Sequence, residues 1–297
     1  MHQDHQGLEA IQTLIEPYFA KNWKFASEKE RNGFFTLGIA RAFSEFFPLV
    51  LNDRVDVTGK MHYFAFLIDD QLDKMNTVDM LSYRERVIKI AHNKISPDRS
   101  NCVEWMLFDT TQALRDIDET LSNDLIEGFC ALLRAQTAPE RASTKHLGPY
   151  LEFREEDAGR PFYTALMRFG GNLHLTNTEL TQLSELESSA FRFMGVLNDV
   201  YSWDKEWRAY QSNLTDGSRP FSAVYCRELE LVFEESAHKI RQGSQGLPRP
   251  EVEKYIKSLE YFMSGVETWS QWSPRYRQRS LDECNPLLIL SSKVGVL

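Results

Sequence analysis

Three aspartates in the first quarter of the chain have the spacing of a metal-binding group. The segment FAFLIDDQLDKM contains Asp69, Asp70 and Asp73. On a helix, Asp69 and Asp73 are four residues apart and share a face, with Asp70 at its edge. Carboxylates at the C-terminal end of a buried helix are unfavourable, because the helix dipole is negative there and like charges raise one another's pKa. A divalent cation would offset this cost, and Mg²⁺ suits a site that also holds phosphate.

A second polar row lies in the last third of the chain. In the segment MGVLNDVYSWDKEW, Asn198, Ser202 and Glu206 follow one another at four-residue spacing. This spacing puts an amide, a hydroxyl and a carboxylate on one helix face, together with Lys205. Such a mixed oxygen set suits a hard cation. Asp199 lies about 100° away on the helix and is expected to orient an arginine.

Each row has a plainer interpretation when it is taken alone. The acidic row would then be an exposed helix end paired with Lys74. The second row would be a polar helix stripe facing solvent. Because both rows follow apolar stretches, a shared cation site is the interpretation that accounts for the two together.

Helices are the elements that must position these residues. Apolar residues recur at three- and four-residue spacing through most of the chain, and no alternating run of β-branched residues stands out. Helices are predicted for Leu8–Ala20, Glu30–Phe47, Asp53–Met75, Met80–Asn93, Val103–Leu133, Leu147–Phe169, Thr178–Tyr210, Pro220–Gln242 and Pro250–Trp272. The predicted fold is all-α, a single domain over residues 1–297 with a pocket between its helices.

The composition excludes several classes of protein. Of 297 residues, 42% are hydrophobic and 26% charged, which excludes disorder and collagen-like structure. The net charge of −9 shows no sign of the basic surface of a nucleic-acid binder. The four cysteines form no CxxC pair, and no apolar run is long enough to span a bilayer. The start of the chain has no apolar signal region, so we expect a cytoplasmic protein with reduced thiols.

The two rows resemble the metal motifs of class I terpene cyclases. In that family a DDxxD motif faces an (N/D)Dxx(S/T)xxKE motif across the mouth of an α-helical barrel. Here Asp69–Asp73 is similar to the first motif and Asn198–Glu206 to the second, about 125 residues later. The resemblance covers roughly residues 30–280 and is closest to fungal single-domain sesquiterpene and diterpene synthases.

Two further landmarks carry the same resemblance. Arg154 stands 44 residues before Asn198, where the family has an arginine that senses diphosphate. It is followed by Asp157, Ala158 and a glycine, where the family has a linker residue and a helix break whose carbonyl points into the pocket. Near the C-terminal end, Arg275-Tyr276 is similar to the pair that caps the diphosphate in the family.

The resemblance implies a Mg²⁺-dependent cyclase for a linear isoprenoid diphosphate. Three Mg²⁺ ions would bridge the diphosphate to the acidic row on one wall and to Asn198, Ser202 and Glu206 on the other. The diphosphate itself would be held by the basic and phenolic groups Arg154, Lys205, Arg275 and Tyr276, which are the implied catalytic residues. Because metal-free carboxylates repel one another, we expect Arg275 and Tyr276 to close over the mouth only with metal and diphosphate bound.

The allylic cation formed by ionisation needs an apolar, aromatic pocket. Phe64, Phe66, Phe191 and Trp269 are the candidates for its wall, because aromatic faces stabilise cations. The backbone at Ala158 would also line the substrate site.

Several alternatives remain open from the sequence. Farnesyl diphosphate is the favoured substrate, with geranylgeranyl diphosphate as the alternative. A chain-elongating prenyltransferase would carry two DDxxD motifs, and this chain carries one. A non-catalytic helical scaffold with acidic patches would keep both polar rows exposed and would not respond to Mg²⁺. No nucleic-acid or membrane partner is expected, and a homodimer is allowed but not required.

Overall fold

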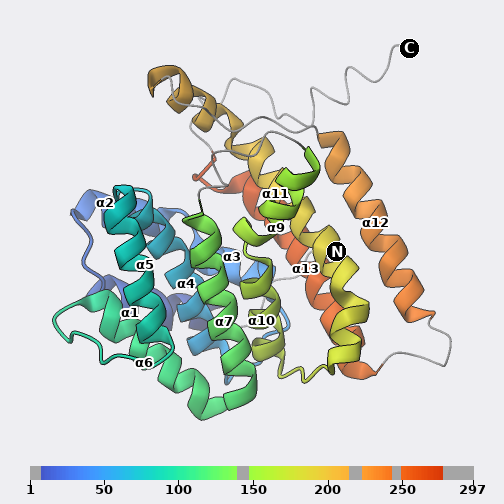
Figure 1. Cartoon of the computed structure of the whole chain (residues 1–297), viewed down its shortest axis with the longest axis horizontal. Helices are drawn as coiled ribbons and strands as arrows, with labels where there is room; N and C mark the ends of the chain where they lie inside the picture. Colours follow the sequence, from blue (N-terminus) through green and yellow to red (C-terminus); the bar gives the residue numbers. More distant parts are fainter. Residues whose placement is uncertain (1–7, 139–146, 214–222, 243–248, 277–297) are drawn as a thin grey trace.

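The chain is a bundle of helices (Figure 1). The computed structural model describes residues 8–138, 147–213, 223–242 and 249–276. Within these ranges, the side chains of residues 9–10, 147–148, 203–213, 223–230 and 236 lie outside the description. The helices are α1 (Leu8–Asn22), α2 (Glu28–Thr36), α3 (Ile39–Phe46), α4 (Val55–Leu72), α5 (Thr77–Ala91), α6 (Cys102–Ile117), α7 (Glu119–Gln136), α9 (Leu147–Asp157), α10 (Arg160–Gly171), α11 (Asn177–Asn213), α12 (Ala223–Arg241) and α13 (Pro250–Trp272).

The predicted all-α class is confirmed. The described residues contain no β-strand. A search of the same residues finds no helix long and apolar enough to cross a membrane.

Three helices that the sequence predicted as continuous are each interrupted. Gly38 separates α2 from α3 with φ of +69°, and Gly159 separates α9 from α10 with φ of +86°. Asp118 separates α6 from α7 in an extended conformation, and its Oδ1 accepts from the N–H of Leu121 at 2.9 Å. The continuous helices were wrong because one left-handed glycine or one N-cap residue breaks the backbone without breaking the apolar periodicity.

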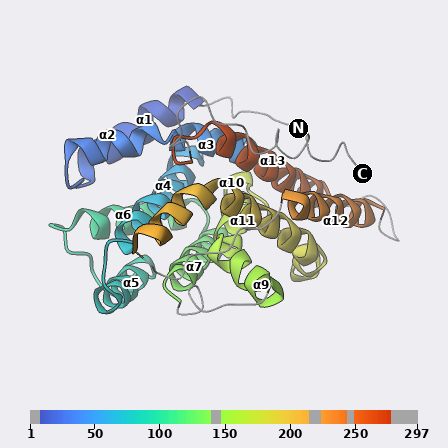
Figure 2. The ribbon, with the colours of Figure 1, turned by 90° about the horizontal axis from the view of Figure 1, so that it is seen from above.

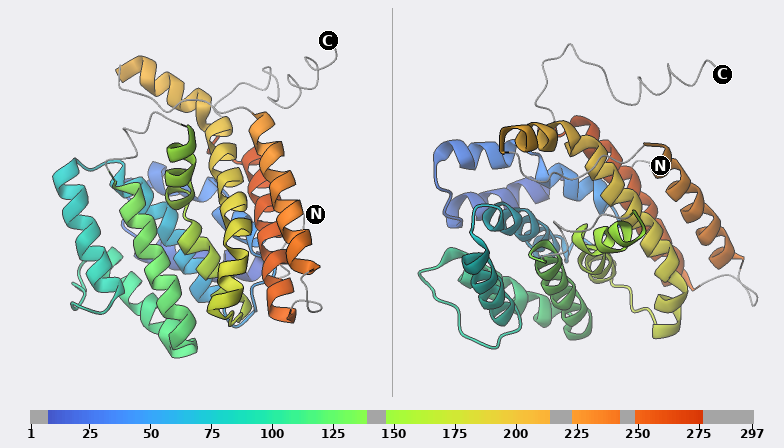
Figure 3. Two further views of the ribbon diagram at one scale, coloured as in Figure 1. Left: turned by 45° about the vertical axis from the view of Figure 1, so that its right-hand side comes forward. Right: turned by 45° about the horizontal axis from the view of Figure 1, so that its top comes forward.

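The helices are arranged in rows around an inner group. Seen from above, α1, α2, α3 and α13 lie along one side, and α5, α7 and α9 lie along the other (Figure 2). Helices α4, α10 and α11 lie between them, with α7 packed on α10 and α12 on α11. Helix α11 has 37 residues and is therefore about 55 Å long. Its C-terminal end extends past the neighbouring helices (Figure 3).

Aromatic side chains fill the centre between these helices. Phe43, Phe191 and Phe262 are fully buried, and they come from α3, α11 and α13. Phe191 and Phe262 stack with ring centroids 5.1 Å apart, and Phe262 lies 5.5 Å from the ring of Tyr163 on α10. Since stacked rings from different helices fix the separation of those helices, this core holds the inner group around the polar rows.

Candidate active site

The acidic row lies in the last turns of α4. This helix buries Leu67, Ile68 and Leu72, which sets its rotation about its axis. Asp69 is left with 16% of its side chain exposed. Asp73 is the C-cap, and its backbone N–H donates to the carbonyl of Asp69 at 3.1 Å while its side chain is exposed. Burial thus falls along the row, from a nearly covered first carboxylate to an exposed last one.

The second polar row lies on α11, where Asn198 and Ser202 are one turn apart. Ser202 is 7% exposed, and its Oγ is buried without a hydrogen-bond partner. Asn198 is half-buried. Lys205 and Glu206 belong to α11, but their side chains lie outside the described residues, so their roles stay predictions.

Arg154 joins α9 to the second row. Its Nη2 donates to Asn198 Oδ1 at 2.8 Å and to Asp199 Oδ1 at 2.9 Å, and its Nη1 donates to Asp157. The Tyr150 hydroxyl donates to the other oxygen of Asp199 at 2.5 Å. Burial alone would lower the pKa of Arg154, but Asp199, Asp157 and Tyr150 raise it overall, so the guanidinium stays charged. The prediction that Asp199 orients an arginine is confirmed.

Two glycines lie close to Arg154 in the fold or in the sequence. At Gly195 on α11, an added Cβ would lie 2.7 Å from Cγ of Arg154. The arginine stem therefore crosses α11 where that helix has no side chain. Gly159 lies between α9 and α10 with a left-handed backbone that favours glycine. The helix break predicted after Ala158 is confirmed, and the role of the Ala158 carbonyl toward a substrate stays a prediction.

Arg275 and Tyr276 connect the two rows. Ser273 caps α13, its carbonyl accepts from the N–H of Tyr276 at 3.2 Å, and its Oγ accepts from the N–H of Arg275 at 3.2 Å. The Arg275 Nη2 then lies 3.4 Å from Asp69 Oδ2. The Asn198 Nδ2 donates to the hydroxyl of Tyr276 at 2.7 Å. The end of α13 therefore reaches both α4 and α11.

The charge of Arg275 explains why the pair lies over the mouth. Burial alone would lower its pKa, but Tyr276, Asp69, Asp70 and Asp73 raise it overall. The guanidinium thus offsets the negative end of α4. The expectation that Arg275 and Tyr276 close over the mouth only with metal and diphosphate bound stays a prediction.

The oxygen groups fit a divalent cation. A buried hydroxyl without a partner at Ser202 is costly unless something binds it. The Asn198 amide and the Asp69 carboxylate supply further oxygens of the kind that Mg²⁺ prefers. Within the part of the chain that the structure describes, no group of three or more His, Cys, Asp or Glu side chains could hold a metal by itself. A cation would therefore be coordinated by both rows, and its remaining ligands would be oxygens of a bound molecule.

Phe66 forms the aromatic surface beneath the mouth. It is partly exposed, and the Arg275 Cζ lies 5.6 Å from the centre of its ring. Trp269 lies 5.8 Å from the same ring and 5.5 Å from the ring of Tyr276. These rings separate the charged groups from the aromatic core below.

Phe64 does not face this surface. Its ring contacts Phe19 and Trp23 near α1, at centroid distances of 5.2 and 6.2 Å. Five residues separate Phe64 from Asp69, which puts them about 140° apart on the helix. The prediction that Phe64 lines the pocket wall is corrected accordingly, whereas Phe191 lies in the aromatic core beside Tyr163, at 6.4 Å.

Sequence reasoning missed three residues of this region. Tyr150 holds Asp199, and only the folded chain brings the two together. The pKa of Tyr163 is raised by burial and also by the charge of Asp69, so the phenol lies within electrostatic reach of the acidic row. His62 lies seven residues before Asp69 on the same face of α4. That spacing was the available signal for His62.

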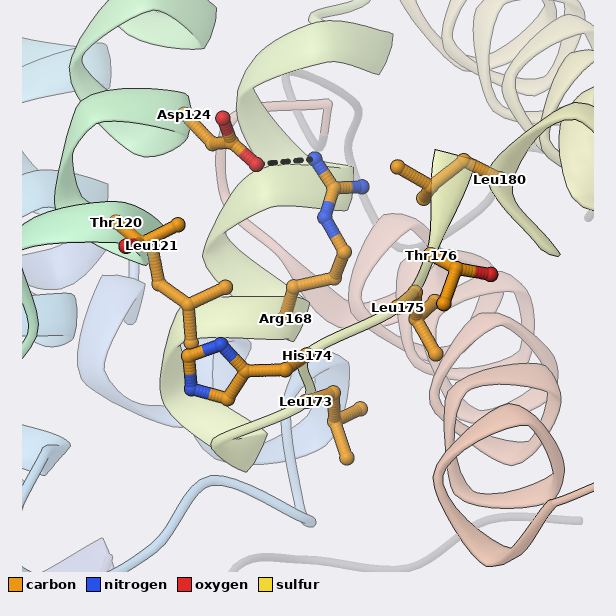
Figure 4. A pocket seen from close by; sticks show the side chains of 9 residues that line it. All are labelled: Thr120, Leu121, Asp124, Arg168, Leu173, His174, Leu175, Thr176 and Leu180. Carbon is orange, nitrogen blue, oxygen red and sulfur yellow. Dashed lines mark ion pairs between the residues drawn. The ribbon is translucent and has the colours of Figure 1, made fainter. Parts of the chain in front are cut away.

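A separate cavity lies at the other end of the bundle. It has a volume of about 270 Å³ and lies between the start of α7, the end of α10 and the start of α11 (Figure 4). Arg168 extends into it and lies 3.8 Å from Asp124. Leu180, in its wall, precedes Asn198 by 18 residues, which is about 27 Å along α11. This cavity is therefore distinct from the candidate active site.

Comparisons with known proteins give one consistent family. The family model for "Terpene synthase family 2, C-terminal metal binding" matches residues 60–228. The chain is 32% identical to an aristolochene synthase of Aspergillus terreus over 295 residues, covering 92% of this chain and 91% of that protein. It is 34% identical to an aristolochene synthase of Penicillium roqueforti, covering 92% of this chain and 85% of that protein. The crystal structure of aristolochene synthase from Penicillium roqueforti matches with a TM-score of 0.79 and 31% identity, covering 92% of this chain and 97% of that one.

Proposed function

Because the chain belongs to terpene synthase family 2, we propose that it ionises farnesyl diphosphate and cyclises the resulting cation to a sesquiterpene. The chain is a terpene cyclase that depends on a divalent metal and acts on an isoprenoid diphosphate. The C15 substrate is proposed because the similar proteins from Aspergillus and Penicillium are named for aristolochene, a C15 hydrocarbon.

One observation supports the proposed site most directly. Arg154 and Tyr276 contact the Asn198 amide from two directions, and Arg275 reaches Asp69 on the facing row. Two guanidinium groups and a phenolic hydroxyl thus lie between two rows of side chains whose oxygens can coordinate a metal ion. A diphosphate needs such a site, because its oxygens bind cations and charge-assisted donors together.

We propose that the metal is Mg²⁺ and that three ions bind with the diphosphate. The side chains that would hold them are Asp69, Asp70 and Asp73 on α4 and Asn198, Ser202 and Glu206 on α11. When bound, the metal would neutralise charge on the leaving diphosphate as a Lewis acid.

The other residues of the chain have separate tasks. Arg154, Arg275 and the predicted Lys205 would hold the diphosphate through charge-assisted hydrogen bonds. The Tyr276 hydroxyl would donate to it in place of its contact with Asn198. A guanidinium offers a fork of donors that fits two phosphate oxygens at once, so it also fixes the orientation of the leaving group.

The cation needs a dry aromatic surface. Phe66 and Trp269 lie directly below Arg275 and Tyr276, where they would contact the isoprenoid chain and exclude water. The backbone at Ala158, in the break after α9, is proposed to face the same chain.

The scaffold alternative is not retained. It required both polar rows to be exposed, but the Asp69 side chain is 16% exposed and Ser202 is 7% exposed. Family membership makes the chain an enzyme. We also propose that residues 1–297 form a single cyclase domain and that the protein forms a homodimer. Sedimentation analysis tests the homodimer.

A substrate panel tests the proposal. Purified protein is incubated with Mg²⁺ and the C10, C15, C20 or C25 diphosphate, and the extract is analysed by gas chromatography and mass spectrometry. We expect cyclic C15 hydrocarbon or alcohol with the highest kcat/KM for farnesyl diphosphate. A higher kcat/KM for geranylgeranyl diphosphate would replace the C15 assignment with the C20 one.

A further inference from the structure

A histidine lies in the core where a hydrocarbon side chain would be expected. His62 on α4 is fully buried, with no exposed surface. Neither Nδ1 nor Nε2 has a hydrogen-bond partner. A buried polar group without a partner is costly, so such groups in native proteins call for an explanation.

Aromatic rings surround His62. The nearest is Phe66, one turn further along α4, at a centroid distance of 5.1 Å. Rings from α3, from its C-cap residue Phe47 and from α10 complete the surroundings: Phe43 at 5.6 Å, Phe46 at 5.8 Å, Phe47 at 5.6 Å and Tyr163 at 5.9 Å. These five rings and His62 are called the aromatic box below. Its faces can stabilise a positive charge, whether that charge is on a substrate or on an imidazolium.

The aromatic box is continuous with the candidate active site. Phe66 lies in the box and also beneath the Arg275 guanidinium. Tyr163 lies in the box and senses the charge of Asp69. His62 and Asp69 share one face of α4 at a separation of seven residues, or about 10.5 Å along the helix. A farnesyl chain anchored at Asp69 through its diphosphate is long enough to reach that depth.

The imidazole is held neutral in this position. Burial is the cause that lowers the pKa of His62, to about 3. The unshared electron pair on one ring nitrogen is therefore present at any neutral pH. A carbocation is so strong an acid that even a weak base suffices to deprotonate it, provided that its electron pair is free and water is absent.

We propose that His62 is a catalytic base that accepts the proton from the last carbocation of the cyclisation. This inference rests on the proposed function, because it requires an isoprenoid cation next to the aromatic box. The C–H bond beside the cationic carbon breaks, and its electron pair forms the alkene. The proton bonds to the ring nitrogen without a hydrogen, which gives an imidazolium. That proton passes to water when the product leaves.

Two apolar variants test this role. His62→Phe and His62→Leu both remove the electron pair, but one side chain is larger and the other smaller than histidine. Diphosphate release measures ionisation, and gas chromatography measures how the cation ends. We expect diphosphate release within about threefold of the wild type, and the share of the wild-type alkene reduced at least about tenfold in both variants, with alcohols or isomeric alkenes in its place. Loss of a base should reduce the share of the wild-type alkene equally in both variants. An effect of side-chain shape alone would differ between the larger and the smaller side chain.

Controls keep the outcomes distinct. Phe19→Leu removes a fully buried ring of α1 that packs against Phe64, on the side of α4 opposite to Asp69. This variant should leave the product mixture unchanged. If the apolar variants do not fold, as judged by thermal unfolding, His62→Gln is measured with the same expectation. A variant that retains the wild-type alkene as its main product overturns the role of His62. No terpene from the wild type with any of the C10 to C25 diphosphates would instead refute the proposed function.

Discussion

The neutral burial of His62 should make the stability of the protein depend on pH. The pKa of this side chain falls from its ordinary value of 6.5 to about 3 in the folded chain, because burial disfavours the charged form. Between these values the unfolded chain binds a proton and the folded chain does not. The free energy of unfolding must therefore fall as the pH drops below about 6.5.

The magnitude follows from the two values. From pH 7.5 to pH 5, the contribution of His62 to the free energy of unfolding falls by about 2 kcal/mol, and below pH 3 the total loss approaches about 5 kcal/mol. The assay is urea denaturation of the wild type and His62→Phe at both pH values. Other titrating groups contribute to both proteins, so they cancel in the difference between the two pH responses.

The variant should be less sensitive to acid than the wild type. We expect its loss of stability between pH 7.5 and pH 5 to be smaller by about 2 kcal/mol. The comparison does not depend on whether phenylalanine fits the site well, because a poor fit lowers the free energy of unfolding by the same amount at both pH values. Identical pH responses in the two proteins would refute the argument that His62 is buried in a neutral state.

Three further predictions concern the polar rows and the residues that hold them. Asp69→Ala and Glu206→Ala should each abolish detectable product by gas chromatography while thermal unfolding stays normal; near-normal turnover at saturating Mg²⁺ would remove that residue from the ligand set. Arg154→Lys should lower kcat/KM at least about 100-fold, because a forked guanidinium is replaced by a point charge; a loss no greater than that of Lys205→Arg would rule out the sensing role. Gly195→Ala should lower the free energy of unfolding, measured by urea denaturation, by about 1–3 kcal/mol and should also lower kcat/KM, since the added methyl displaces the Arg154 side chain. An unaltered kcat/KM would show that the position of this side chain along α11 does not affect catalysis.

Some of the fold follows from local signals in the sequence. Helix α13 has the predicted bounds Pro250–Trp272, because a proline in its first turn and the Ser-Pro after it limit it. The breaks at Gly38 and Asp118 were missed, since apolar residues keep their helical spacing across both of them, and the break at Gly159 was implied only by the family resemblance. A single residue changes the backbone direction there, and only its φ angle reveals it.

The candidate site also combines features that local sequence signals predict with features that only the fold shows. Helical spacing alone predicted that Asn198 and Ser202 lie one turn apart on α11 and that Asp199 lies to the side, toward Arg154; the shared face of Lys205 and Glu206 stays a prediction. Helical spacing should also have excluded Phe64, which lies about 140° from Asp69. The pairing of Tyr150 with Asp199 depends on tertiary packing between α9 and α11. The lack of partners for His62 cannot be seen in a sequence at all, because it depends on every neighbour in the fold.

The central claim is that both polar rows together bind metal and diphosphate. Thermal unfolding with Mg²⁺, with inorganic diphosphate, and with both tests this claim without requiring turnover. At ligand concentrations about 100-fold above Kd, the two together should raise Tm by about 5–10 °C, with little effect of either alone. The shift should disappear in Asp69→Asn and in Ser202→Ala, one change on each row. A full shift in both variants would contradict the account, and so would no shift in the wild type at saturating concentrations.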